Sequence, residues 1–169
     1  MKINSLNGNG DIQNLSDKIE KIQNRLNGFS TIWFTLDDPI TLTKDVLVTL
    51  RLTNIRKIIG EGFSTYIEPD GSYIVCQRKG IICVSCEIAT NSRSGYVEIL
   101  LYKNIHYMGS SAMGTTNVSY GCQNLPLKVF AVENGDKICM KVKSSVSGDK
   151  ISADERTGMT AFYLYLDEL

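Results

Sequence analysis

The stretch IICVSCEIA, residues 81–89, is a nearly continuous apolar run with the length of one β-strand. A short run of this kind is typical of a central strand that is buried on both faces of a β-sandwich. Residues 91–95 (NSRSG) follow it and are predicted to be a connection, because Asn, Ser and Gly cluster there. The next strand is predicted at residues 96–102 (YVEILLY), so this part of the chain indicates a β-rich core.

Outward from this stretch, the apolar pattern has a period of two from residue 29 to the end, which predicts an all-β head. Residues 137–143 (KICMKVK) alternate clearly, with Ile138, Met140 and Val142 predicted to point inward. About eight to ten strands at these spacings favour a β-sandwich over units in which strands alternate with helices. Further strands are predicted at residues 30–36, 46–52, 63–67, 73–76, 125–132 and 160–166.

Residues 109–121 (GSSAMGTTNVSYG) combine low hydrophobicity with loop-like composition, and they are predicted to form a long loop. Loops on a rigid sandwich often carry recognition. The candidates for receptor contact are Tyr107, Met113, Asn117 and Tyr120, chiefly because aromatic and flexible side chains anchor interfaces at low entropic cost. The stretch could instead be an exposed connection or pack between subunits, and the sequence leaves these alternatives open.

The N-terminal part of the chain predicts an assembly. Between residues 10 and 28 the apolar positions are separated by three and four residues in turn, which is the spacing of a heptad repeat. These positions are Ile12, Leu15, Ile19, Ile22 and Leu26. Isoleucine at both core positions of the heptad favours three or more helices, so we expect a trimeric coiled coil at residues 1–28 before a head at 29–169. The alternative is an amphipathic helix that packs on its own head.

Charge and cysteine content limit the classes of function. Lys and Arg together number 18, as do Asp and Glu, so the net charge of zero provides no argument for nucleic acid or an anionic membrane. No run approaches the roughly 18 apolar residues of a membrane span, and the polar first ten residues are unlike a signal peptide. Five cysteines leave at least one thiol unpaired, which favours synthesis in a reducing cytosol.

The sequence contains few candidates for catalytic or metal-binding chemistry. Cys83 and Cys86 are spaced like a zinc or redox pair, but positions three apart in a strand face opposite sides, so we expect buried thiols. His106 has no nucleophile in a recognisable motif beside it. Asp37 and Asp38 are expected to be solvated in a turn. We therefore expect no catalytic residue, no metal and no cofactor.

Several short motifs occur in a recognisable order. Residues 97–104 (VEILLYKN) end in Lys-Asn, residues 127–132 are followed by Gly-Asp-Lys-Ile at 135–138, and residues 160–164 (TAFYL) close the chain. This order resembles the trimeric jelly rolls of the tumour-necrosis-factor and complement-globular-head type. The resemblance extends from about residue 73 to residue 166, while the collagen stalk and signal peptide of secreted members are absent.

The resemblance implies a jelly-roll head that assembles as a homotrimer, with Phe162, Tyr163 and Leu164 buried between subunits. A coiled coil in front of a compact trimeric β-head resembles the tip of a bacteriophage fibre. The head fibres of short-tailed phages that infect Gram-positive hosts are similar in plan.

We therefore expect a non-enzymatic homotrimeric virion fibre, on the head or tail of a phage, whose distal head binds a bacterial cell-surface glycan or wall polymer. Such a fibre would be made in the host cytoplasm and carried on the virion surface with other virion proteins, without nucleic-acid binding or membrane insertion. The alternatives are a spore-surface or secreted binding module of the same fold and, less favoured, a fibre-borne polysaccharide depolymerase.

Overall fold

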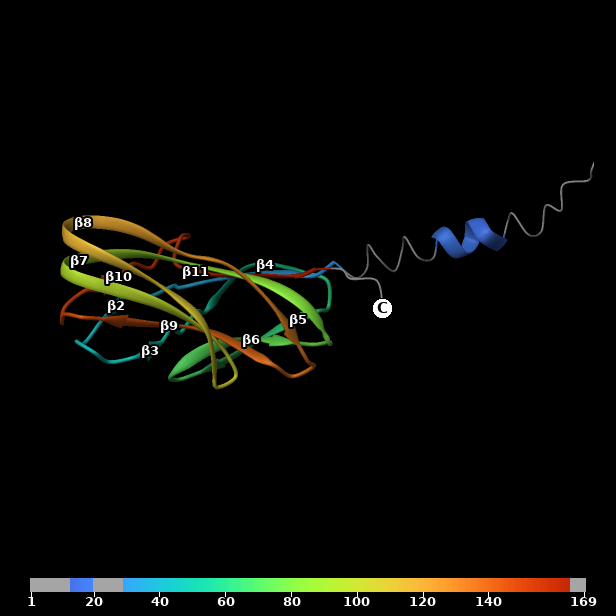
Figure 1. The fold of residues 1–169 in the computed structure, drawn as a ribbon, viewed down its shortest axis with the longest axis horizontal. Coiled ribbons are helices and arrows are strands. Elements are labelled where there is room, and N and C mark those ends of the chain that lie inside the picture. Colours follow the sequence, from blue (N-terminus) through green and yellow to red (C-terminus); the bar gives the residue numbers. More distant parts are fainter. Residues whose placement is uncertain (1–12, 20–28, 165–169) are drawn as a thin grey trace, which may run out of the picture.

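The computed structural model describes residues 13–19 and 29–164, apart from the side chains of residues 92–94 and 113–120. Residues 13–19 form a helix, as the heptad pattern predicts for this part of the chain. Residues 29–164 form a head with eleven described strands (Figure 1). They are β1 (Thr31–Thr35), β2 (Ile40–Thr41), β3 (Val48–Thr49), β4 (Asn54–Ile59), β5 (Phe63–Glu68), β6 (Gly71–Cys76), β7 (Gly80–Lys103), β8 (His106–Val132), β9 (Lys137–Ser144), β10 (Lys150–Ile151) and β11 (Gly158–Leu164).

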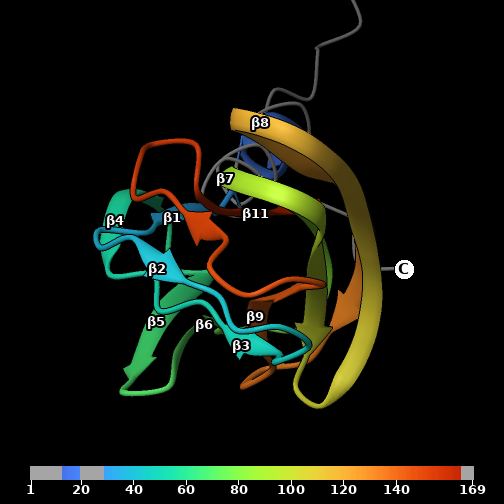
Figure 2. The ribbon, with the colours of Figure 1, turned by 90° about the vertical axis from the view of Figure 1, so that its left-hand side faces the viewer.

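The strands form two antiparallel sheets that pack face to face as a jelly-roll sandwich (Figure 2). Sheet I has the order β4, β1, β11, the first half of β7 and the second half of β8. Sheet II has the order β5, β6, β9, the second half of β7 and the first half of β8. Strand β3 pairs with β9, and β10 pairs with β2 and with the middle of β7. This architecture confirms the predicted all-β jelly roll.

β7 and β8 form one long antiparallel ribbon that belongs to both sheets. The ribbon turns at Asn104, whose φ of 55° is left-handed, and it pairs from Lys103 opposite His106 to Gly80 opposite Val132. Seen from the end of the head, both strands curve from one layer into the other (Figure 2). The ribbon therefore joins the two sheets without a loop between them.

Two segments that the sequence indicated as loops are in fact strands. Residues 91–95 lie inside β7 and residues 109–121 lie inside β8. The core residues of β7 stop at Ile88 and resume at Val97, because the ribbon passes from sheet I to sheet II between them. Gly95, with a φ of 111°, provides a bend at this crossing. Low hydrophobicity in these two segments therefore did not indicate a lack of strand pairing.

The core lies between the sheets and takes alternate residues from the strands of both. Ile138, Met140 and Val142 of β9 are at most 1% exposed, which confirms their predicted inward orientation. The inward side of the apolar run at residues 81–89 is buried, but Ile81, Ser85 and Glu87 on its outer side are only half-buried, so the predicted burial on both faces is wrong for the outer face. The contributions of this run to the core are Ile82, Val84, Cys86 and Ile88.

Both described ends of the head lie at the same end of the sandwich, because β1 and β11 pair with Thr31 opposite Phe162. The middle of the β7–β8 ribbon lies at the opposite end (Figure 1). In the described parts of the chain, no helix is long and apolar enough to cross a membrane.

Candidate functional site

The predicted receptor-contact residues lie along β8 and not on a loop. Tyr107 is 54% exposed, and its hydroxyl donates a hydrogen bond of 2.8 Å to the Oγ of Ser110. The backbone of Met113, Asn117 and Tyr120 belongs to β8, while their side chains lie outside the described residues. Receptor contact by these four residues stays a prediction.

The predicted coiled-coil residues are described only in part. Leu15 and Ile19 lie on the helix at residues 13–19, where they are 60% and 47% exposed. Ile12, Ile22 and Leu26 lie outside the described residues. An exposed apolar pair on a short helix is what a coiled-coil seam without its partner would show.

The three trimer residues predicted in β11 do not face the same side. Tyr163 is only 5% exposed; its ring stacks on Phe63 with 4.7 Å between centroids, and its hydroxyl donates to the backbone oxygen of Arg78. This residue is buried inside its own head and, contrary to the prediction, is not available to a neighbouring subunit. Phe162 and Leu164 alternate with it and lie on the outer side of sheet I.

Sheet I presents an exposed surface that we call the apolar face. It consists of Trp33, Leu127, Val129, Phe162 and Leu164. Leu127 and Val129 of β8 are 52% and 54% exposed, and Trp33 of β1 is 36% exposed. Phe162, Cys83 and Val129 form a continuous apolar row across β11, β7 and β8, whereas Trp33 and Leu127 lie on either side of the polar Thr160 and Ser85. Contiguous exposed apolar surface on a soluble domain marks an interaction site.

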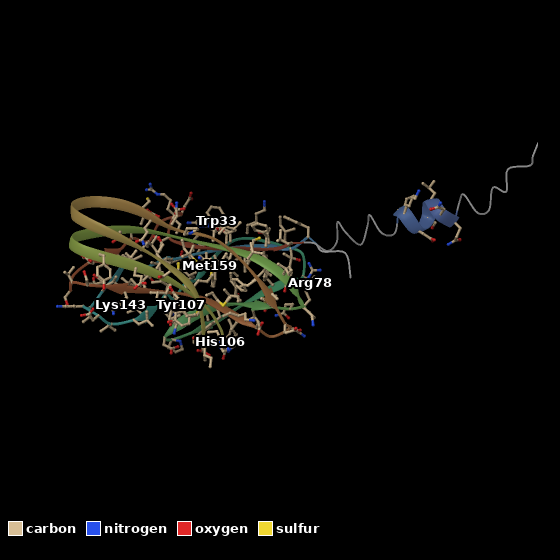
Figure 3. The ribbon with its side chains drawn as sticks, in the orientation of Figure 1. Trp33, Arg78, His106, Tyr107, Lys143 and Met159 are labelled. Atoms are coloured by element: carbon tan, nitrogen blue, oxygen red, sulfur yellow. The ribbon has the colours of Figure 1, made fainter. Side chains whose placement is uncertain are left out.

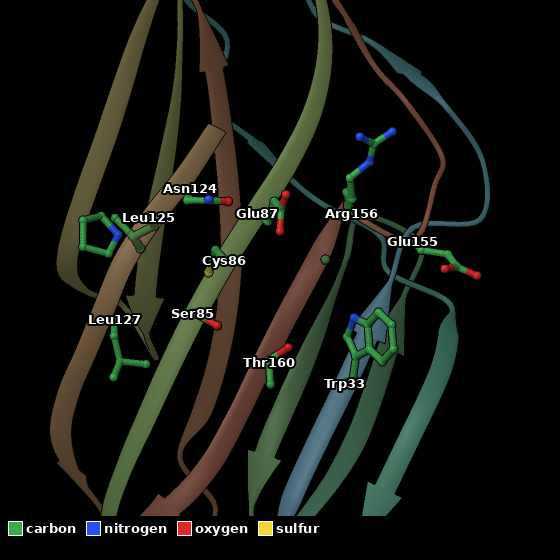
Figure 4. A pocket seen from close by; sticks show the side chains of 12 residues that line it. Trp33, Ser85, Cys86, Glu87, Asn124, Leu125, Leu127, Glu155, Arg156 and Thr160 are labelled. Atoms are coloured by element: carbon green, nitrogen blue, oxygen red, sulfur yellow. The ribbon is translucent and has the colours of Figure 1, made fainter. Parts of the chain in front are cut away.

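A groove of about 620 Å³ is hollowed into this face (Figure 4). Trp33 and Leu127 stand on either side of it, with Ser85 and Thr160 between them. Glu87 and Arg156 add charge at its rim. The groove therefore has apolar walls and a polar floor, and protein contact surfaces also combine apolar and polar groups.

Sheet II carries a different surface on its outer side, which we call the tyrosine–lysine face. It consists of Tyr66, Tyr73, Tyr102, Tyr107, Lys137 and Lys141. These residues come from five strands, and β9, which carries both lysines, lies between β6 and β7 only in the folded sheet. Sequence reasoning found Tyr107 and missed the others; their one signal is that Lys137 and Lys141 alternate with the inward residues of β9.

The Lys-Asn and Gly-Asp motifs meet in space and join two turns. Asp136 accepts hydrogen bonds from the Nδ2 of Asn104 (2.7 Å) and the backbone N–H of Glu133 (2.9 Å), and the Nζ of Lys103 lies 3.4 Å away. The Oδ1 of Asn104 accepts from the backbone N–H of Lys137. Burial alone would raise the pKa of Asp136, but these hydrogen bonds and Lys103 more than offset it and lower the pKa. The motifs thus have a structural role.

Residues that could support catalysis or metal binding are dispersed. Among the residues that the structure describes, no group of three or more His, Cys, Asp or Glu side chains could hold a metal ion. His106 is exposed where the β7–β8 ribbon turns (Figure 3). Asp37 accepts a hydrogen bond of 3.0 Å from the hydroxyl of Thr53 and is otherwise exposed, as expected for a turn.

Cys83 and Cys86 lie on opposite faces of β7, as their spacing predicts. Cys86 belongs to the core, whereas Cys83 pairs with Phe162 on the outer side of sheet I. Both are 2% exposed, and burial raises the pKa of each thiol. Burial also raises the pKa of Cys76 and of Cys139 to about 11.

We expect the native protein to react rapidly through one thiol, that of Cys122. It is the exposed cysteine, and a raised pKa keeps the other four protonated and unreactive at neutral pH. Titration with a chromogenic disulfide reagent at pH 7.5 should release one equivalent of chromophore per chain quickly in buffer. In guanidinium chloride it should release five equivalents, one for each cysteine. The Cys122→Ser variant should lose the fast phase, and a fast phase that survives in it would contradict the assignment.

No protein-family model and no curated protein matches the sequence. The fold is similar to that of murine APRIL: the structure at pH 5.0 is 11% identical with a TM-score of 0.64, covering 80% of this chain and 99% of that chain. The structure at pH 8.0 is 12% identical with a TM-score of 0.63 over the same shares. The PRD1 vertex protein P5 is 11% identical with a TM-score of 0.55, covering 81% of this chain and 96% of that chain. At these identities the similarity shows the fold alone, a TNF-like jelly roll.

Proposed function

We propose that this TNF-like jelly roll is the head of a homotrimeric bacteriophage fibre that binds the host cell surface and has no enzymatic activity. The observation that carries the proposal is the apolar face of sheet I, with Trp33, Leu127 and Val129 exposed on it. A surface of this kind calls for a protein partner, and TNF-like folds are typically trimeric. In this proposal, a second and a third copy of the chain cover the apolar face.

The helix at residues 13–19 supports the same assembly. Its exposed Leu15 and Ile19 occupy core positions of the heptad repeat. A helix of this length is marginal in water, so association with equivalent helices would stabilise it. Because both described ends of the head lie at one end of the sandwich, three helices can meet there while the β7–β8 ribbon extends away from them.

A virion location is supported by the similarity in fold to the PRD1 vertex protein P5, a phage vertex protein. The binding partner in this proposal is a glycan or wall polymer of the host surface. Three identical heads on one axis would raise weak single-site binding by avidity.

The similarity to murine APRIL favours a second candidate, a cell-derived binding module of the same fold on a spore surface or in secretion. Neighbouring genes distinguish the two candidates. Structural phage genes beside this one support the fibre, whereas sporulation or export genes support the binding module.

The proposal is tested first by the mass of the full chain, measured by light scattering on a sizing column. We expect about 56 kDa, three times the 18.8 kDa of one chain. The fluorescently labelled trimer should then bind host cells and compete with phage adsorption, and it should release no reducing sugar from host walls. A monomeric mass would remove the fibre proposal, and sugar release would replace it with a depolymerase.

A further inference from the structure

We propose that the tyrosine–lysine face of sheet II is the receptor-binding site and that its ligand is an anionic sugar polymer that carries phosphate groups. This inference rests on the proposed function, because it names the site and the ligand class of the proposed host binding. Four tyrosines on β5, β6, β7 and β8 surround two lysines of β9, which lies between β6 and β7 in sheet II.

One half of the face is centred on Lys137. Its Nζ lies 4.3 Å from the ring centroid of Tyr66 and 5.3 Å from that of Tyr73. The two rings are 6.4 Å apart, and Tyr66 is 46% exposed on the outermost strand of the sheet. This half therefore offers one cation between two accessible aromatic rings.

The other half repeats the arrangement around Lys141. Its Nζ lies 4.6 Å from the ring centroid of Tyr102, which contacts the ring of Tyr107 edge to face at 5.9 Å. Tyr107 is more than half exposed. Between the halves, Cys139 is 1% exposed beneath its neighbours, so the face is a continuous surface without a gap at its centre.

Both lysines are available for an anion. Among the described residues, no carboxylate lies within 4.0 Å of the Nζ of Lys137 or Lys141. In contrast, Lys143 on the same strand lies 3.6 Å from Asp45. The ring contacts hold the ammonium groups in position, and an ammonium group binds phosphate as a point charge.

The tyrosines favour a sugar polymer. Tyrosine rings are rigid and amphipathic, so they provide contact area at low entropic cost to a ligand with both apolar and hydroxyl-bearing surfaces. Lys137 and Lys141 are four residues apart on one strand, which places their Cα atoms about 13 Å apart. The phosphate-binding atoms are the two Nζ groups, which the rings of Tyr66, Tyr73 and Tyr102 hold over the face as two separate cations.

Single-stranded nucleic acid also combines charge with stacking groups, so it is the competing ligand that the test must include. Glu68 on β5 and Glu98 on β7 lie on the same side of sheet II, beside the two lysine sites. The chain as a whole has no net charge, so it lacks the broad positive field that attracts nucleic acid. The face is on the opposite side of the sandwich from the apolar face, so a trimer can form while the ligand is bound.

The test is native affinity electrophoresis of the full chain in gels that contain a purified glycosylated poly(glycerol phosphate) or poly(ribitol phosphate) wall polymer. We expect at least one of them to retard the wild type, and the Lys137→Gln/Lys141→Gln variant to bind about tenfold more weakly. A control variant, Lys79→Gln/Lys150→Gln, loses the same charge at exposed positions outside the face and should bind within about twofold of the wild type. Dextran and a single-stranded DNA 12-mer should have no effect.

A second pair of variants tests stacking. Tyr66→Phe should keep the affinity for the phosphate polymer, whereas Tyr66→Ala should weaken it several-fold. Thermal melting should show that both variants remain folded. The inference is overturned if neither phosphate polymer retards the wild type, if the lysine variant matches its control, or if DNA binds as well. If the wild-type trimer and its lysine variant bind host cells equally well, the inference is wrong and the fibre proposal is unaffected. If the wild type does not bind host cells, the fibre proposal is wrong instead.

Discussion

Replacing Leu127 and Val129 together by glutamate should convert the proposed trimer into monomers while the head stays folded. Both side chains are more than half exposed in the single chain, so the substitutions place carboxylates in water and disturb no core contact. In a trimer each interface would instead bury the two carboxylates without partners, at a cost of several kcal/mol, and lose the burial of two apolar side chains. Light scattering should show the mass of one chain where the wild type shows three.

A matched control is Val46→Glu/Leu47→Glu. These side chains are 46% and 42% exposed and lie ahead of β3, away from the apolar face. This variant should leave the trimer intact, because it adds the same charge to a surface that stays in solvent. Far-UV circular dichroism should be unchanged in all variants. Trimers that persist with both glutamates would show that the apolar face is not between subunits, and the groove beside Trp33 would then need another occupant.

Replacing Asp136 by asparagine should destabilise the head by about 2 kcal/mol, the typical effect of weakening charge-assisted hydrogen bonds in a partly buried site. Its carboxylate connects the β7–β8 turn to the β8–β9 turn through Asn104, Glu133 and Lys103. Denaturant unfolding at pH 7 measures the loss. The Asp70→Asn variant, in the exposed β5–β6 turn, is the control and should change the free energy of unfolding by less than about 0.5 kcal/mol.

The effect of Asp136 should depend on pH in a defined direction. Its pKa is lower in the folded state than in the unfolded chain, where it is about 3.9. The ionised carboxylate therefore contributes its full stability above the unfolded pKa, and the contribution is lost as the pH falls through the lowered folded pKa. The difference between wild type and Asp136→Asn should be constant from pH 5 to 7 and shrink below pH 4. A difference that grew on acidification would contradict the assignment.

Local patterns predicted the strands that face the core. The alternation of Ile138, Met140 and Val142, and the core positions within residues 81–89, follow from strand geometry and from the gain in burying apolar surface. The same pattern was uninformative at residues 109–121, because their backbone pairs along the β7–β8 ribbon and backbone pairing does not require an apolar pattern. Low hydrophobicity there is compatible with either a loop or a strand.

Identifying the candidate sites required the tertiary structure more than predicting the strands did. Sequence analysis named Tyr107, and it assigned Phe162, Tyr163 and Leu164 together to the contact between subunits without separating the two faces of the strand. Adjacent residues in a strand point to opposite faces, and only the packing of Phe63 against Tyr163 shows which face of β11 is the core.

The sequence by itself determined that this chain forms a β-sandwich head behind a helix with an apolar seam, because both features rest on periodicities that neighbouring residues create. Only the tertiary structure decided that Tyr66, Tyr73 and Tyr102 converge on Lys137 and Lys141. These residues meet because sheet II has the order β5, β6, β9, β7, β8, which brings together strands that are far apart in the chain. Strand order depends on the global packing of both sheets, and no local pattern encodes it.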